Sequence, residues 1–446
     1  MHLILWLAVC AAIAVGLRKR LPLLLIGTLA TWIAVPAVAA AVVTGKSSGS
    51  LGMHPATWLV LVIFAVQLLD NQRAVASAIS RQVLVWLGLG TVATIAVLVT
   101  KTGATGSGVV LVLDQMIAPM LLALLIWTAW HTDARATATL RTGILALAGA
   151  EAVYTLMQAA LGSVLLYEHF YASLYWFPYI YGRWMGTTDH PLVLSLFMCG
   201  AIPLVSGINR VPVQVPLLVL FVVTVALTQS RAGVVAAAVG VMYVVGASRL
   251  AAGKKIAVLV LLGGAGYAIA TSSLVTGVTE RVANDTGSTS ARTTALGYFL
   301  DNWQHYLVGQ GAGASYRVAD QAGLASSFES AFLMYSIDFG VGFALLYFGF
   351  QVYLVVAGAR RPVLGARQAA LVVLVLCQTF SALAADSLAG PLLWTLVALA
   401  SLPGARTPLQ TPPEATAPAE VSTPAEVPPP RRRRAYAEAP SVRTSS

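Results

Sequence analysis

The sequence predicts an all-α fold, a polytopic bundle of about 12–13 transmembrane helices, from three observations. Of the 446 residues, 58% are hydrophobic and only 10% are charged, which is more apolar surface than one soluble core of this length buries. The apolar residues gather into stretches near the roughly 20 residues that a helix needs to cross a bilayer. The basic residues lie between these stretches in a pattern typical of membrane topology.

Thirteen apolar stretches between Met1 and Pro403 are the predicted spans. Their approximate ranges are 1–17, 21–43, 54–70, 83–100, 108–130, 142–162, 190–206, 213–229, 232–248, 256–271, 329–357, 368–384 and 387–402. The basic cluster Arg18–Arg20 follows the first stretch instead of preceding it, which favours a retained first helix over a cleaved signal peptide. The three cysteines lie singly inside apolar stretches and are interpreted as packing residues.

Alternation of these spans assigns every Lys and Arg to one of two sides. One side receives about 20 of the 27 basic residues and the other about 7. The positive-inside rule then places the first side in the cytoplasm. We expect a multi-pass protein of the cytoplasmic (inner) membrane, with an extracytoplasmic active face and a cytoplasmic C-terminus. The outer cations are Lys46, Lys101, Arg183, Arg231, Arg281, Arg292 and Arg317.

The chain is expected to have three regions. Residues 1–162 form an N-terminal transmembrane bundle. Residues 163–402 form a transmembrane catalytic region with two extracytoplasmic loops, an aromatic-rich loop 163–189 and a long polar loop 272–328 with an amphipathic middle around 298–307. Residues 403–446 are rich in Pro, Ala, Thr and Glu and contain four consecutive arginines, a composition that predicts a disordered cytoplasmic tail.

The outer arginines are the first candidates for chemistry, because the positive-inside rule disfavours them at this face. Arginine binds phosphate through a planar fork of donors, and a lipid-linked pyrophosphate is a natural partner in the outer leaflet. Arg231 begins a span after the polar turn 228–230, where free backbone N–H groups add to an anion site. The alternative is that each arginine pairs with an outer carboxylate such as Glu168, Asp189 or Asp320.

Glu329 is the acidic candidate, at the point where the long outer loop meets the span 329–357. A carboxylate there can accept the proton of an acceptor hydroxyl group. The alternatives are an ion pair with Arg292 or Arg317 and a helix-start carboxylate favoured by the helix dipole.

Asp114, Glu151 and Asp338 fall inside predicted spans, where ionisable groups are costly. In a transporter they would mark an ion path. As structural groups they would pair with Arg231 or satisfy the backbone of a broken helix. We prefer the structural interpretation, because no chain of cations inside the bundle complements them.

The sequence lacks the motifs that other functional classes require. The net charge of +10 comes from short basic clusters between apolar runs, which argues against nucleic acid as a partner. The six histidines show no metal-ligand spacing, and no Walker loop, dinucleotide fingerprint or nucleophile elbow occurs. We therefore expect neither a metal nor a cofactor. The aromatic residues of the loop 163–189, Trp184 included, serve either as an interfacial belt or as platforms for sugar rings.

These residues resemble the O-antigen ligase and O-antigen polymerase superfamily of bacterial membrane glycosyltransferases over roughly 180–345. Residues 183–191 are similar to the family stretch R-x-x-G-T-x-x-H-P, and 228–233 to its T-x-S-R-[GA]-[AG] turn. Residues 290–292 followed by 309–313 resemble its S-x-R and G-x-G-x-G pattern. The family often has His-[Asn/Ser/Gln] nine residues before a Gly pair, and here Glu329-Ser330 occupies that frame. This glutamate favours a polymerase over a ligase.

The resemblance implies a metal-independent, inverting transfer of a glycan from a polyprenyl-pyrophosphate donor to a glycan or lipid acceptor, without a cofactor. It implies that Arg183, Arg231 and Arg292 hold the pyrophosphate and that Glu329 deprotonates the acceptor. His190, Arg317 and Trp184 are further candidates for substrate binding. Alternatives are a proton-coupled transporter or flippase and a non-catalytic protein that works with other cell-envelope assembly proteins. The usual twelve spans of the family would leave one extra helix at the N-terminus.

Overall fold

The structure is a computed structural model that describes residues 1–45, 51–103, 108–171, 182–247, 252–270, 286–324, 328–357, 363–381, 383 and 387–402. Within these ranges the chain is helical and contains no strand, and all of them belong to one compact unit. The predicted tail 403–446, Arg281, and much of the aromatic loop lie outside the described residues. The predicted all-α class is confirmed for the part of the chain that is described.

The first half of the chain contains helices separated by short turns. They are α1 His2–Gly16, α2 Leu21–Ala34, the 3-10 turn η1 Ala37–Ala39, α3 Ala40–Thr44, α4 Pro55–Asp70, α5 Gln72–Ser80, α6 Val83–Gly103, α7 Gly108–Val112, the π-helical turn η2 Leu113–Ile117, α8 Ala118–Thr132, α9 Ala136–Leu161 and α10 Glu168–Tyr171.

The second half continues in the same way. Its elements are α12 Pro191–Leu204, η3 Val205–Gly207, α13 Val211–Leu227, α14 Arg231–Ala247, α15 Ala252–Ala270, α17 Thr286–Asn302, η4 Trp303–Tyr306, α18 Ala314–Gln321, α19 Ala331–Phe339, α20 Val341–Ala357, α21 Ala366–Leu376 and α23 Ala389–Ser401.

Each predicted span coincides with a helix or a broken helix, but few of these helices are long. Three helical stretches are long and apolar enough to cross a membrane, at 83–100, 108–132 and 136–161, and the number rises to five if each bent pair counts as one span. Seven other apolar helices are 10–17 residues long. The described residues therefore support a helical membrane protein with three to five candidate spans.

Two of the predicted continuous spans are broken. The stretch 21–43 bends by 87° between α2 and the segment 37–44. The predicted span 54–70 coincides with α4, and α5 follows it after a bend of 105°. The stretch 329–357 is two helices, because Gly340 stands between α19 and α20 with φ +105°. Glycine alone adopts this conformation at little cost, and a Cβ there would press on the carbonyl oxygen of Leu307.

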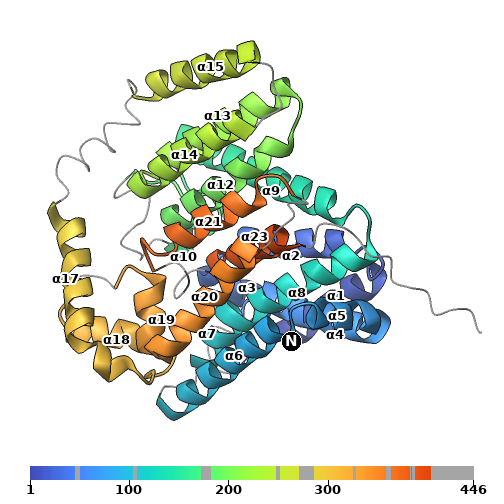
Figure 1. Cartoon of the computed structure of the whole chain (residues 1–446), viewed down its shortest axis with the longest axis vertical. Helices are drawn as coiled ribbons and strands as arrows, with labels where there is room; N and C mark the ends of the chain where they lie inside the picture. Colours follow the sequence, from blue (N-terminus) through green and yellow to red (C-terminus); the bar gives the residue numbers. More distant parts are fainter. Residues whose placement is uncertain are drawn as a thin grey trace, which may run out of the picture. The chain divides into compact units, whose positions relative to one another are not determined.

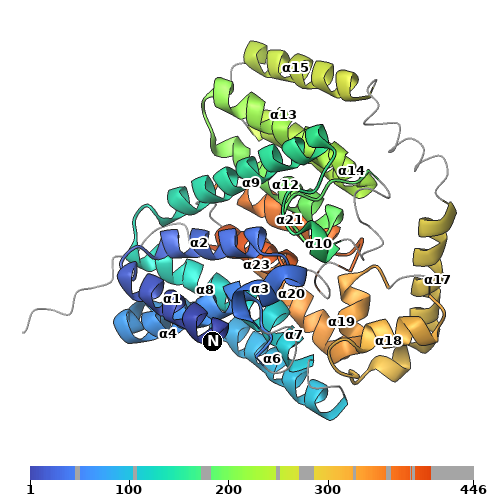
Figure 2. The ribbon, with the colours of Figure 1, turned by 180° about the vertical axis from the view of Figure 1, so that it is seen from behind.

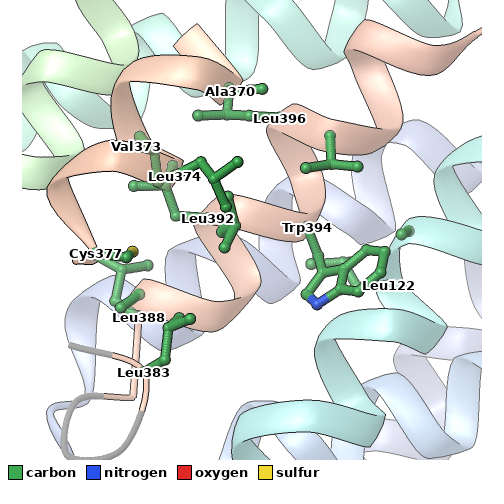
Figure 3. Packing of buried hydrophobic residues seen from close by; sticks show 14 of the residues in the cluster. Leu122, Ala370, Val373, Leu374, Cys377, Leu383, Leu388, Leu392, Trp394 and Leu396 are labelled. Atoms are coloured by element: carbon green, nitrogen blue, oxygen red, sulfur yellow. The ribbon is translucent and has the colours of Figure 1, made fainter. Parts of the chain in front are cut away.

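Helices α21 and α23 lie in the middle of the bundle in both views (Figures 1 and 2). Helix α21 packs against α12, α23 packs against α8, and the two helices pack against each other. Figure 3 shows Leu392 and Leu396 of α23 beside α21, with Trp394 turned toward Leu122 of α8. Trp394 is 1% exposed, and its Nε1–H donates to the hydroxyl of Tyr347 at 2.8 Å.

The predicted long polar loop 272–328 is largely helical where it is described. Helix α17, η4 and α18 occupy it, and its predicted amphipathic middle buries Phe299 and Tyr306, whose rings stack with centroids 5.9 Å apart. Helices α17, α18 and α19 lie close together in Figure 2. Helix α18 packs on α19 and η4 packs on α19, so this segment is held against the start of the broken span.

Candidate functional site

The starts of α12, α14, α19 and α23 are linked by contacts between the segments that precede them. Asp189, just before α12, accepts hydrogen bonds from the Ser387 N–H at 2.8 Å and the Ser387 hydroxyl at 2.6 Å, just before α23. The same carboxylate accepts from the Ala37 N–H. Burial raises the pKa of Asp189, and the hydrogen bonds from Ser387 and Ala37 oppose the rise. Asp189 therefore joins three segments that are far apart in sequence.

Arg183 lies against the turn that precedes Arg231. The segment 182–184 runs along the turn between α13 and α14, where the Trp184 N–H donates to the Leu227 carbonyl at 3.1 Å. The Arg183 Nε–H donates to the Thr228 carbonyl at 3.0 Å, three residues before Arg231 opens α14. Both arginine residues are half-buried. The segment that carries Arg183 therefore lies against the turn that precedes Arg231.

Ser230 and Gly233 are small residues that allow α12 and α14 to pack closely at this turn. The Ser230 hydroxyl caps α14 by accepting from the Gly233 N–H at 3.1 Å. A Cβ at Gly233 would overlap the hydroxyl of Ser195 on α12, and the Cys199 thiol of α12 donates to the Gly233 carbonyl at 3.3 Å. Gly233 therefore lets α12 and α14 approach closely beside Arg231.

His190 is the N-cap of α12, and its ring also contacts the segment that follows α21. Its Nδ1 accepts from the Leu192 N–H at 3.0 Å, and Pro191 opens the helix. The charge of Arg183 acts on the imidazole, and the ring stacks on Phe380 with centroids 6.4 Å apart and planes 21° apart. His190 thus lies between Arg183 and the segment that follows α21.

Arg292 of α17 and Glu329 form an ion pair, as one of the alternatives for Glu329 predicted. The Arg292 Nε lies 2.6 Å from the Glu329 Oε2, and the side chains are 43% and 22% exposed. Glu329 adopts φ +47°, an uncommon conformation for a residue other than glycine, just before the N-cap Ser330 of α19. A strained backbone thus directs a partly accessible carboxylate toward the arginine.

The short segment 377–380 connects the two groups of candidates. The Cys377 carbonyl accepts from the Ala331 N–H at 3.1 Å, and the Gln378 Oε1 accepts from the Phe332 N–H at 2.9 Å and the Ser330 hydroxyl at 3.4 Å. Two residues later, Phe380 stacks on His190. The sequence offered little signal for Gln378 and Phe380, because they stand in an apolar stretch that reads as membrane span.

Arg317 lies elsewhere among the described contacts. It is exposed on α18, and its charge acts on Asp338 of α19. Asp338 holds the start of α18, since its carboxylate accepts from the Ser315 N–H at 2.7 Å and the Gly313 N–H at 3.2 Å. The contacts therefore place Arg317 beside a structural carboxylate.

The other two carboxylates of the predicted spans, Asp114 and Glu151, also accept hydrogen bonds from backbone. Both carboxylate oxygens of Asp114, in η2, lie 3.1 Å from the backbone nitrogen of His54 at the start of α4. Glu151 of α9 accepts from the N–H and the hydroxyl of Thr187, in the loop before α12. These contacts favour the structural interpretation of all three, in which a buried carboxylate satisfies N–H groups where helices are interrupted.

The first glycine of the motif at 309–313 is a packing requirement that can be tested. A Cβ at Gly309 would overlap the backbone of Phe339 at the end of α19. We expect Gly309→Ala to lower the free energy of unfolding by about 1–3 kcal/mol, because backbone cannot yield as a flexible side chain does. Thermal unfolding in detergent measures this. The control is Gly297→Ala on α17, where nothing lies within 4 Å of the added carbon; an equal loss in both variants would contradict the prediction.

We define the candidate site as a set of residues from distant parts of the chain: Arg183, His190, Arg231, Arg292, Glu329 and the segment 377–380. Trp184 contributes its backbone to this arrangement. No model of a known protein family matches the chain, and no curated protein matches it with significance. Interpretation of the site therefore rests on its residues and contacts.

Proposed function

We propose that this protein transfers a glycan from a polyprenyl-pyrophosphate donor to an acceptor hydroxyl at the outer face of the cytoplasmic membrane. It would act as a surface-polysaccharide polymerase or as a ligase similar to the O-antigen ligases. The observation that carries the proposal is the pairing of Glu329 with Arg292, joined through the segment 377–380 to His190 and Arg183. A candidate base and two guanidinium groups are thus connected through neighbouring contacts.

The donor's pyrophosphate fits the electrostatics of this network. Helices α12, α14 and α19 begin here, and the N-terminus of a helix carries a partial positive charge. Arg183 before α12, Arg231 at the start of α14 and Arg292 of α17 add three guanidinium groups. Together they supply the charge that a pyrophosphate needs without a metal ion.

The transfer follows from these roles. The Glu329 carboxylate takes the proton of the acceptor hydroxyl, whose oxygen attacks the anomeric carbon of the donor glycan. The bond from that carbon to the pyrophosphate oxygen breaks with inversion, and the leaving polyprenyl pyrophosphate keeps the electron pair. The arginines stabilise the negative charge that develops on it, and the activated donor supplies the free energy.

The ion pair gives the substrates an order in this proposal. Without donor, Arg292 holds Glu329. A bound pyrophosphate competes for the guanidinium group and frees the carboxylate to act as a base. The donor would then bind before the acceptor is activated, which limits unproductive reaction with water.

The proposal includes a membrane arrangement beyond the three to five candidate spans. The thirteen apolar stretches would all cross or enter the bilayer, with the shorter helices in its interior, and the tail would lie in the cytoplasm. The lipid bilayer, the lipid-linked glycan and a glycan or lipid acceptor are the proposed partners. Other cell-envelope assembly proteins are further partners.

Transfer in detergent tests the function directly. Lipid-linked repeat units are extracted from a strain that lacks this chain and incubated with the purified protein in detergent containing EDTA. We expect new glycosidic bonds, seen as longer lipid-linked glycans by mass spectrometry, with the same yield as without EDTA. A requirement for closed vesicles and a proton gradient, with no bond formed in detergent, would contradict the proposal and support a transporter. Accumulation of single units in that strain indicates a polymerase, and accumulation of long glycans a ligase.

A further inference from the structure

A cavity lies away from the candidate site and is lined by different residues. It encloses about 300 Å³. Its lining residues are Ala78, Arg81, Gln82, Trp127, Trp130, His131 and Ser401. They come from the end of α5 and the turn after it, the end of α8, and the last residue of α23.

The cavity and the candidate site lie at opposite ends of α23. Ser387, which binds Asp189, precedes this helix, and Ser401 ends it. At 1.5 Å per residue, the 13 residues of α23 separate the two places by about 20 Å. The cavity therefore belongs to the other end of the helical bundle.

The bend before α5 bears on where this cavity would lie in a membrane. Helix α5 leaves α4 at 105°. If α4 crosses the bilayer, α5 runs nearly parallel to the membrane plane, with Ala74, Val75 and Ala78 buried and Arg73 exposed. A helix with one apolar face in this orientation is typical of the interface where lipid headgroups lie.

The polar groups of the lining suit a phosphate ester. Arg81 supplies a guanidinium group, which is the usual partner of phosphate. The Gln82 Oε1 is buried and has no hydrogen-bond partner among the described residues, so a rotation of this lining side chain would let it accept from a ligand hydroxyl. The Trp127 Nε1–H donates to the Ala398 carbonyl at 3.2 Å, so the ring of Trp127 forms an apolar wall of the cavity. Tryptophan is enriched at this depth of the membrane.

We propose that this cavity binds a phosphate ester that carries a free hydroxyl group, with the headgroup of an anionic phospholipid as its source. The phosphate would lie against Arg81 and a headgroup hydroxyl would donate to Gln82, while the acyl chains remain in the bilayer. Bound lipid would fasten α5 to α8 and to the end of α23. This inference does not depend on glycan transfer.

Native mass spectrometry of the full-length protein in detergent tests the site. The protein is delipidated and titrated with phosphatidylglycerol, with phosphatidylcholine and with glycerol 3-phosphate. We expect preferential binding of phosphatidylglycerol, weakened about tenfold by Arg81→Ala. Gln82→Leu should reduce the preference for phosphatidylglycerol without removing it. Arg73→Ala, on α5 but not among the lining residues, is the matched control and should bind like the wild type.

Each outcome is informative. Competition by glycerol 3-phosphate as effective as that of the lipid would support the phosphate site and assign it to a soluble ester instead. Equal binding of phosphatidylcholine and phosphatidylglycerol, or an Arg73→Ala loss as large as that of Arg81→Ala, would overturn the proposal. Thermal unfolding of each variant shows whether a loss of binding reflects a loss of folding.

Discussion

Replacement of Glu329 by glutamine is expected to lower the rate of glycan transfer by about 10²- to 10⁴-fold, the contribution of a positioned general base. The amide has the size of the carboxylate but accepts no proton from the acceptor hydroxyl. The fold should be unaffected, because an ion pair with side chains 43% and 22% exposed contributes only about 0–1 kcal/mol. The rate is measured in detergent on lipid-linked repeat units, beside thermal unfolding.

Two further variants separate catalysis from structure at this position. Glu168→Gln makes the same chemical change at an exposed residue of α10 and should leave the rate unchanged. The double variant Arg292→Glu with Glu329→Arg restores an ion pair of reversed polarity, and we expect it to fold and yet to remain inactive. Recovery of transfer in the double variant would show that the pair serves structure alone.

Replacement of Arg231 by alanine is the second large effect, a loss of about 10²- to 10³-fold in the rate of transfer. Arg231 opens α14 beside the segment that carries Arg183, so its charge adds to the N-terminus of a helix where the pyrophosphate is proposed to lie. Stabilisation of the leaving group acts on the transition state, which predicts a fall in kcat more than a rise in KM. Steady-state kinetics with the extracted donor measures both.

Arg210→Ala is the matched control for this arginine. Arg210 precedes α13 and Arg231 follows it, so the two changes remove the same side chain at opposite ends of one helix. Arg210 is exposed, and its variant should keep the wild-type rate. Arg231→Lys should recover part of the loss, because lysine keeps the charge without the planar fork. Wild-type kcat in Arg231→Ala would remove Arg231 from the proposed site.

Helix positions were the most predictable feature of this chain. A long apolar stretch between polar connections predicts a helix, because a helix satisfies its backbone groups within one segment, and α6, α9 and α13 lie close to their predicted ranges. Breaks inside a stretch were less predictable. Gly340 is one glycine among 38, and its role depends on the carbonyl of Leu307, which no local pattern reveals.

For the candidate site too, some features followed from the sequence and others only from the tertiary structure. The sequence by itself determined the helical class, the approximate helix positions and the residue types suited to phosphate and to a base, because hydropathy and side-chain chemistry are local properties. Only the tertiary structure decided that Glu329 meets Arg292, that Asp114, Glu151 and Asp338 serve the backbone, and that Gln378 and Phe380 link Glu329's helix to His190. Such partners are brought together by the packing of α12, α19, α21 and α23, which depends on side chains distant in sequence.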